Sequence, residues 1–440
     1  MIETIWYLAG VLFILLGIAV SIALHELGHL LPAKAFGVKV TKYMIGFGPT
    51  IFSKKVGDTE YGIKAIPLGG FIAMIGMFPP AKPNKIIRWK FWQKMVESAR
   101  LSQIEQFGPD EPKRNFYQLA VYKRIIVMLG GPTMNLILGT IFMIIALVGI
   151  GSQTSTTQLV NIAECVPSGD VSQKCKATDP ASPAKLAGLK AGDLITQVEG
   201  VPVKFWVDVN PLLADKTGKP VSLQVLRGQE TLALTVTPIL AKRAVLDPKT
   251  GQPVVDSKGQ LILKMQPYIG LVLDQGYKPR SFAEALAVSG DSVTQTAKLV
   301  LNLPQQVSKI AISTFTGGTR ATDGPISIIG VGQIAGTIAS NDQVTLLDKV
   351  RTGFGILASL NFALFVFNLI PLLPLDGGHV AGGIYEAIKR GWFKLLRKPD
   401  PGPADTSMLV PITTLVWLVL IAISLLFILA DFINPINLGS

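Results

Sequence analysis

Charged residues, cysteines and histidines are all scarce in this sequence. Asp, Glu, Lys and Arg make up 16% of the 440 residues, below their share in an ordinary soluble domain, whereas hydrophobic residues reach 49%. There are two cysteines and three histidines, and two of the histidines fall within one pentapeptide. The low charge excludes an ordinary soluble domain, and the composition predicts a multi-pass membrane protein with soluble parts.

The first long apolar run, residues 4–31, also lacks a basic flank on its N-terminal side. Glu3 precedes the run, and Lys34, Lys39 and Lys42 follow it. The run is longer than the core of a signal peptide, so we expect it to be retained as a membrane helix. Because basic residues concentrate on the cytoplasmic side of membrane proteins, we predict that the N-terminus lies outside and the segment after the run in the cytoplasm.

The net charge of +12 does not indicate a nucleic-acid partner. The basic residues cluster beside the apolar runs, chiefly in residues 79–124 and 377–407, as expected for cytoplasmic loops that face anionic lipid. Trp89, Phe91 and Trp92 interleave with the lysines and arginines of the first cluster. This pattern is typical of an amphipathic helix on the inner leaflet, although a solvated cytoplasmic loop is an alternative.

The pentapeptide His25-Glu26-Leu27-Gly28-His29 stands near the end of the first apolar run. Histidines four residues apart share one face of a helix, so both imidazoles can reach a single metal ion. Glu26 is placed to act as general base on a metal-bound water. Such a match arises by chance in soluble proteins, but a glutamate and two histidines inside a membrane helix are costly without a partner, which favours a functional metal site.

A catalytic zinc ion usually has three protein ligands and one water, so we expect a third ligand from another apolar segment. Residues 354–376 form such a segment, which leads into the sequence NLIPLLPLDGGH from Asn368 to His379. The prolines break the helix and two glycines follow Asp376, which gives this aspartate the freedom to reach a metal. Two histidines, Asp376 and Zn²⁺ carry a net positive charge, which ionised Glu26 would cancel.

Each residue of this second motif also has a simpler interpretation. Asp376 could cap the helix that follows, and Asn368 could make a hydrogen bond between helices. On chemistry alone, His379 competes with Asp376 as the third ligand. The two motifs on separate apolar segments are together more specific than either one alone.

HELGH in the first apolar segment and N-x-x-P-x-x-P-x-D-G-G in a later one together resemble the site-2 protease family of intramembrane zinc metalloproteases, in particular the bacterial regulator-of-sigma-E protease type. The resemblance implies that one Zn²⁺ per chain is bound by His25, His29 and Asp376, and that Glu26 is the catalytic acid and base. Asn368 would help to hold the substrate strand. The implied substrates are single-span membrane proteins such as anti-sigma factors and remnant signal peptides, cleaved at the bacterial cytoplasmic membrane.

Two further segments fit the same resemblance. Residues 34–78 contain short β-prone runs punctuated by glycines, including Gly69 and Gly70, and the family has here a membrane-associated β-hairpin region whose edge pairs with an unwound substrate. An ordinary cytoplasmic β-meander is the alternative. In the apolar residues 125–150, Gly131-Pro132-Thr133-Met134-Asn135 resembles the small-residue and asparagine motif that packs against the first helix. Asn135 could also polarise the scissile carbonyl.

Residues 158–273 are polar and mixed, and we expect them to lie outside the membrane. Residues 182–195, SPAKLAGLKAGDLI, resemble the bacterial type of PDZ domain, which binds peptides or substrate tails by strand addition. We see one copy, with residues 246–260 as a β-hairpin insertion. Cys165 and Cys175 both fall in this region, and an oxidising compartment favours a disulfide between them over two free thiols.

We therefore predict a multi-pass α-helical membrane protein with four transmembrane helices, a membrane-associated β-region and an extracytoplasmic PDZ domain. A catalytically silent PDZ scaffold is disfavoured by the intact ligands and base. A metal transporter is disfavoured because the second and fourth spans carry no charged residue. The predicted parts are spans at 1–33, 125–150, 354–376 and 408–430, the β-region at 34–78, the basic region at 79–124, the PDZ domain at 158–273, surface helices with a GPISI segment at 281–347, and a cytoplasmic loop at 377–407.

Overall fold

The computed structural model of the chain describes residues 2–80, 89–107, 111, 113–166, 175–176, 178–245, 254, 261–317 and 324–434. Contacts divide the chain into two compact units. The membrane unit consists of Met1–Gly149 and Ser281–Ser440, and the sheet unit consists of Ile150–Arg280.

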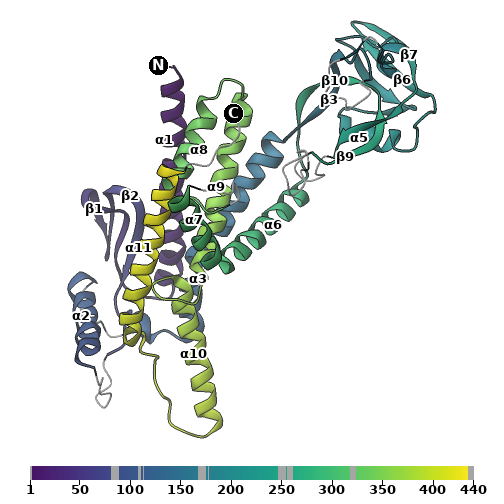
Figure 1. Ribbon diagram of the computed structural model, residues 1–440. Helices are drawn as coiled ribbons and strands as arrows, with labels where there is room; N and C mark the ends of the chain where they lie inside the picture. The colour runs from purple at the N-terminus through teal and green to yellow at the C-terminus, as the bar shows by residue number, and fades with distance from the viewer. Residues whose placement is uncertain are drawn as a thin grey trace. The chain divides into compact units, whose positions relative to one another are not determined.

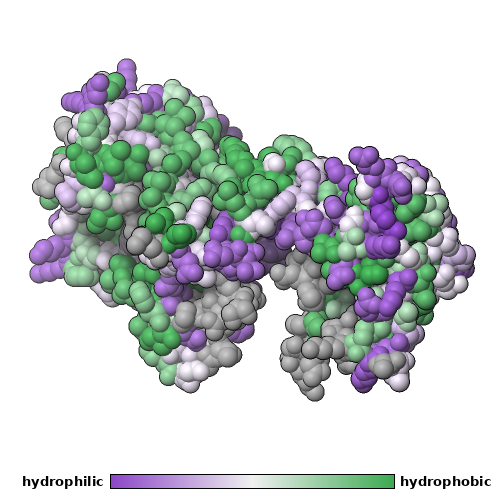
Figure 2. Space-filling view, turned by 90° about the horizontal axis from the view of Figure 1, so that it is seen from above, coloured by the Kyte–Doolittle hydropathy of each residue, from purple (hydrophilic) through white to green (hydrophobic). Residues whose placement is uncertain are grey.

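Among the residues that the structure describes, four helices of the membrane unit are long and apolar enough to cross a bilayer, as the sequence predicts (Figure 1). They are α1 (Ile2–Ala35), α3 (Val121–Ile144, extended by π-helical turns over Ile145–Ile150), α9 (Leu346–Asn368) and α11 (Val410–Ile433, preceded by the 3-10 turn Thr406–Leu409). In the space-filling view of Figure 2, apolar side chains gather on the membrane unit, and large apolar residues of α1 and α11 are exposed. These surfaces are suited to lipid rather than water.

Helices α1 and α3 approach each other closely at a pair of glycines. A Cβ atom on Gly28 would lie 2.3 Å from the carbonyl oxygen of Gly130, and one on Gly130 would lie 2.0 Å from the carbonyl oxygen of Gly28. Neither position can hold a side chain without moving a backbone. Small residues are the usual means of bringing membrane helices together, and here the crossing occurs inside the HELGH segment.

The third span differs in its limits from the predicted 354–376. Helix α9 begins after Thr345, whose Oγ1 accepts a hydrogen bond of 3.2 Å from the amide of Asp348, and it ends at Asn368. Pro371 and Pro374 follow, and they cannot continue a helix. The next helix, α10, covers Asp376–Leu395.

The region 281–347 contains α6 (Phe282–Leu301), α7 (Leu303–Thr316) and α8 (Ile328–Ser340). The sequence predicts surface helices here, and α8 departs from that expectation because its Val331 and Ala335 are buried against Ile14 and Ile18 of α1. Small residues explain the difference, since they allow α8 to pack closely on its neighbours. A Cβ atom on Gly336, for example, would lie 2.5 Å from the ring of Tyr7.

Two long strands follow α1, namely β1 (Val40–Val56) and β2 (Thr59–Met74). Residues 42–45 of β1 lie between two stretches of β2, facing residues 70–73 on one side and 60–63 on the other. The stretch 70–74 is therefore an edge, with β1 as its one strand partner in the described part of the chain. The end of this edge at Met74 lies in a hydrophobic cluster, where Val40 and Met74 pack with Leu30 of α1 and Val127 of α3.

Helix α2 (Lys90–Phe107) lies in the basic region, and Trp89, Phe91, Leu101 and Ile104 expose large apolar side chains there. Residues 81–88, which include Lys82, Lys85 and Arg88 of the predicted basic cluster, lie outside the described residues.

The sheet unit is built on a six-stranded sheet. Its strand order is β10-β3-β4-β6-β7, with β5 paired to β4, and β8 and β9 form a separate two-stranded sheet. The bounds are β3 (Ser152–Ile162), α4 (Pro183–Leu186), β4 (Leu194–Val198), β5 (Val201–Pro202), α5 (Trp206–Leu213), β6 (Val221–Arg227), β7 (Glu230–Val236), β8 (Ile239–Ala244), β9 (Leu263–Tyr268) and β10 (Leu271–Lys278). Of the predicted insertion 246–260, only residue 254 lies within the described residues.

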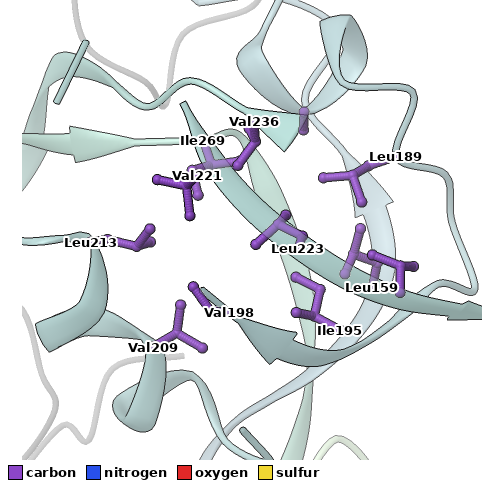
Figure 3. Close-up of a cluster of buried hydrophobic side chains, with 12 residues drawn as sticks. Leu159, Leu189, Ile195, Val198, Val209, Leu213, Val221, Leu223, Val236 and Ile269 are labelled. Carbon is purple, nitrogen blue, oxygen red and sulfur yellow. The ribbon is translucent and has the colours of Figure 1, made fainter. Parts of the chain in front are cut away.

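Alternate residues of the strands form the core of this unit. Val221, Leu223 and Val225 of β6 are buried and meet Leu159 of β3 and Val209 of α5, as Figure 3 shows for the labelled members. The period of two is what a sheet covered on one face requires. Cys165 and Cys175 form a disulfide with sulfurs 2.02 Å apart, as expected from two cysteines in a region assigned to an oxidising compartment.

Candidate metal centre

His25 and His29 project from the same face of α1, one turn apart. Their ring centroids are 4.8 Å apart, and the two Nε2 atoms are separated by 3.2 Å. His29 is buried and the His25 side chain is 13% exposed. The two ring nitrogens thus point at one location beside the helix.

Asp376 brings a carboxylate to the same location from a distant part of the chain. Its Oδ2 lies 3.4 Å from His25 Nε2 and 3.3 Å from His29 Nε2. The loop between α9 and α10 folds back tightly onto the first turn of α10, where a Cβ atom on Gly377 or Gly378 would lie 2.4 Å from loop backbone. The glycines are therefore required for the carboxylate to arrive here.

Asp376 does not take the capping position that was an alternative for it. The N-cap of α10 is Leu375, and Asp376 is the first helical residue. His379, the competing ligand, lies in the next turn of α10. Among the described residues, the group of side chains able to hold a metal is His25, His29 and Asp376, without His379.

The spacing of these three donors matches a zinc site. Zinc–ligand bonds of about 2.0–2.1 Å in a tetrahedron place the ligand atoms about 3.3 Å from one another. The three separations between donor atoms are 3.2, 3.3 and 3.4 Å. Two imidazoles, one carboxylate and an open fourth position are also the ligand set of a catalytic rather than a structural zinc site.

The neighbouring helix leaves room for such an ion. A Cβ atom on Gly131 of α3 would lie 2.2 Å from His29 Nε2 and 2.7 Å from His25 Nε2. The absent side chain is what allows α3 to pass beside the donor atoms without obstructing them. The residues present therefore fit a zinc ion.

The remaining nitrogen of each ring contacts α3. His29 Nδ1 lies 2.7 Å from the carbonyl oxygen of Val127, and His25 Nδ1 lies 3.0 Å from Nδ2 of Asn135. Contacts of this kind orient metal-binding histidines and fix their tautomers. Asn135 thus packs on α1 through His25.

Glu26 lies next to the group and is held by the edge of the β-region. The backbone N–H of Ile72 faces its carboxylate. A Cβ atom on Gly70 would lie 3.0 Å from Glu26 Cγ, so the strand runs directly against the glutamate side chain. The Tyr43 hydroxyl donates to the carbonyl oxygen of Ala23 at 2.7 Å and joins β1 to the same turn of α1.

Two further predicted site residues, Gly69 and Asn368, lie in β2 and at the end of α9. Gly69 has a φ of +130°, and a Cβ atom there would lie 2.0 Å from the Phe47 ring, so it serves the packing of the β-region. Asn368 is the last residue of α9.

Sequence reasoning did not identify the roles of Val127 and Ile72, because both act through backbone atoms.

Sequence reasoning also missed a buried pair in the first and third spans. Asn361 Nδ2 donates to Ser21 Oγ at 2.9 Å, one turn before His25. Polar residues in otherwise apolar runs were the available signal for this pair.

The comparison with known proteins agrees with the geometry. Peptidase family M50 matches residues 13–395, a range that holds His25, His29 and Asp376. The chain is 32% identical to the zinc metalloprotease Rip1 of Mycobacterium tuberculosis over 98% of this chain and 99% of that protein. It is 31% identical to Rip1 of Mycolicibacterium smegmatis over 98% of each chain, and 27% identical to the metalloprotease MmpA of Caulobacter vibrioides over 87% of each. The chain therefore belongs to peptidase family M50 and is a zinc metalloprotease.

Proposed function

We propose that this metalloprotease hydrolyses peptide bonds of single-span membrane proteins within or near the bilayer. One observation carries the proposal. Two histidines of a helix long and apolar enough to span a membrane lie close to an aspartate, with the three donor atoms at the separations expected of zinc ligands. Ionisable side chains in such a helix are retained for function. Anti-sigma factors and remnant signal peptides are the substrates that the family resemblance implies.

In this proposal His25, His29 and Asp376 hold one zinc ion per chain, and Glu26 is the general base and acid. When bound, zinc polarises the peptide carbonyl and makes water acidic enough to attack near neutral pH. Glu26 takes a proton from the attacking water and returns it to the amine that leaves. The edge of β2, through the Gly70 backbone beside Glu26 Cγ and the nearby Ile72 N–H, limits the positions that the Glu26 carboxylate can take.

A substrate must be extended for its peptide bond to be reached, and the β-region offers a place for it. Residues 70–74 form an edge that faces Glu26, and their backbone can pair with an extended segment. We infer that the substrate strand is added here, close to Gly69 and Gly70, and that Asn368 holds it from the other side. Phe47, Ile51 and Phe52 expose apolar side chains on the outer part of β1, which supports contact of the β-region with lipid.

We infer further that the sheet unit is a PDZ domain that binds peptides or substrate tails outside the cytoplasm. β10 is a terminal strand of its sheet and follows Gly270, whose φ is +90°. This arrangement supports strand addition at β10. The Cys165–Cys175 disulfide supports an oxidising compartment. The basic loops then lie in the cytoplasm, with the protein in a bacterial cytoplasmic membrane.

The proposal is tested with purified full-length protein in detergent and a single-span membrane protein as substrate. Cleavage within or next to the substrate's apolar segment is expected, with loss of activity after chelation and recovery with zinc. Unchanged cleavage by zinc-free protein would refute the mechanism. Cleavage confined to soluble loops of the substrate would refute the intramembrane location.

A further inference from the structure

Asn135 is buried in α3 with one half of its amide unpartnered. Its exposure is 0%, and its Nδ2 lies 3.0 Å from His25 Nδ1. Its Oδ1 is buried and has no hydrogen-bond partner among the residues that the structure describes. A buried acceptor without a partner costs about 1–3 kcal/mol, so such an atom calls for an explanation.

The two histidines differ in what faces their Nδ1 atoms. His29 Nδ1 faces the Val127 carbonyl oxygen, which can only accept a hydrogen bond. His29 therefore carries its proton on Nδ1, and Nε2 keeps a lone pair toward Asp376. His25 Nδ1 faces an amide N–H group, which can only donate. With that contact the proton of neutral His25 lies on Nε2, where it blocks coordination of a metal.

A half-turn of the Asn135 amide removes this conflict. It exchanges the positions of Oδ1 and Nδ2, which have nearly the same size and reach. Oδ1 then accepts from His25 Nδ1–H, and His25 Nε2 presents a lone pair like that of His29. The turn also gives Oδ1, which as it stands has no partner among the described residues, a hydrogen-bond donor.

We propose that Asn135 is a positioning residue that selects the metal-binding tautomer of His25 by accepting a hydrogen bond from its Nδ1–H through Oδ1. The inference rests on the proposed role of His25 as a zinc ligand. It assigns the amide oxygen of Asn135 to the histidine, whereas polarising the scissile carbonyl of a substrate would be a task of the amide N–H donors.

The test compares zinc affinity, by chelator competition with the full-length protein in detergent, for Asn135→Asp and Asn135→Leu. A carboxylate is an acceptor and oxygen–histidine–zinc contacts of this kind are common, so Asn135→Asp should bind zinc at least as tightly as the unsubstituted protein. Leucine has a similar size but accepts no hydrogen bond, so Asn135→Leu should bind zinc about 10–100-fold more weakly.

Asn361→Leu is the matched control. Asn361 is also a buried asparagine of the membrane unit with an unpartnered Oδ1, but its Nδ2 donates to Ser21 Oγ and to the Leu357 carbonyl oxygen. Its substitution should leave zinc affinity unchanged while removing a hydrogen bond between helices. Equal zinc affinities of the two leucine variants, or equal losses in Asn135→Asp and Asn135→Leu, would overturn the proposal.

A further variant separates this proposal from the proposed function. His25→Ala should lose zinc more severely than any Asn135 variant. Retention of zinc by His25→Ala would refute the ligand assignment itself, whereas loss of zinc there with unchanged affinity in Asn135→Leu would refute only the role of Asn135.

Discussion

Two aspartates, one in each unit, lie among polar groups of different kinds. Asp193 of the sheet unit accepts hydrogen bonds from Arg227 Nε and Nη2 at 2.7 and 2.8 Å and from the backbone N–H of Lys190 at 2.8 Å. Asp376 of the membrane unit faces Nε2 of His25 and His29 at 3.4 and 3.3 Å. Arginine carries a permanent positive charge, whereas a neutral imidazole offers only a lone pair once its proton is on Nδ1.

The difference shows how an aspartate in a structural ion pair is distinguished from one in a candidate metal centre. Asp193 has its countercharge within the protein, so its surroundings are complete without any ligand. Asp376 meets two other electron-pair donors, and three such donors close together are stable only around a cation or a shared proton. The same residue type thus supports the fold in one unit and belongs to the candidate metal centre of the other.

The largest effect is expected for Glu26→Gln. The glutamine keeps the size of the side chain but cannot take a proton, so cleavage should fall by at least about 10²–10⁴-fold. Zinc content should stay close to that of the unsubstituted protein, because Glu26 is not among the three donors. Elemental analysis and substrate cleavage are measured on the same sample. Normal turnover in a zinc-loaded Glu26→Gln protein would contradict the assignment of the base.

Asp376→Asn tests the aspartate of the membrane unit directly. An amide cannot supply the negative charge that zinc requires here, so we expect loss of both zinc and activity. His379→Ala is the matched control on the same helix and should keep bound zinc. The opposite pattern of zinc contents would make His379 the third ligand.

Gly131→Ala should fill the space beside the donor atoms. The new methyl group would lie 2.2 Å from His29 Nε2, closer than any unstrained contact. Zinc affinity and cleavage should fall together, while Gly149→Ala in the same span has open space at its Cβ position and should change neither. Chelator competition on both variants gives the measurement. Equal zinc affinities of the two variants would show that α3 moves away from His29 to accommodate the added methyl group.

The residues of the candidate site were the most predictable from sequence. His25, Glu26, His29 and Asp376 are ionisable side chains in or next to apolar runs, and such exceptions stand out because membrane helices seldom tolerate them. Four apolar helices and an alternating sheet core follow from hydrophobic periodicity in the same direct way.

Backbone partners and helix packing were not predictable. The Val127 carbonyl and the Ile72 N–H are backbone groups. Nearly every residue type has such groups, so no sequence pattern marks them. The place of α8 beside α1 depends on the depth of grooves at small residues such as Gly336, which composition alone does not reveal. The orientation of the Asn135 amide depends in turn on which nitrogen of His25 carries the proton.

A smaller effect is expected in the sheet unit from Asp193→Asn. Burial alone would raise the pKa of Asp193, but the hydrogen bonds from Arg227 and from the Lys190 N–H outweigh burial and hold this pKa below its ordinary value. The folded pKa is thus lower than the unfolded value of about 3.9, so the stabilisation is complete above about pH 4 and is lost as the pH falls through the folded pKa. At neutral pH the substitution should cost the sheet unit about 1–3 kcal/mol.

Hydrogen exchange of β4 and β6 amides measures this change in the full-length protein. Differences between the two proteins at each pH cancel the intrinsic exchange rate, and they should shrink as the pH is lowered below about 4. Glu199→Gln is the control, since Glu199 pairs with Lys216 at 3.2 Å where both side chains are in contact with water, and a glutamine oxygen can still accept the hydrogen bond of 2.7 Å from the Ser222 N–H. Its effect should be much smaller. A difference that is independent of pH would show that Asp193 acts through shape rather than charge.

The smallest effect on the chemistry itself is expected from removal of the whole sheet unit. Ser152 and Lys278 are paired across β3 and β10, so the two ends of the unit lie side by side and a short flexible linker can replace the residues between them. No proposed zinc ligand lies in the deleted segment, so cleavage of substrates already trimmed on their outer side should continue. If the unit selects substrates as a size filter, the shortened protein should also cleave untrimmed substrates that the full chain rejects.

The assay compares long and trimmed versions of one single-span substrate with both proteins. Discrimination that persists after the deletion would exclude the filter and leave peptide binding, or support of the membrane unit, as the role of the sheet unit. Loss of zinc on deletion would instead show that the metal centre depends on the sheet unit for its structure.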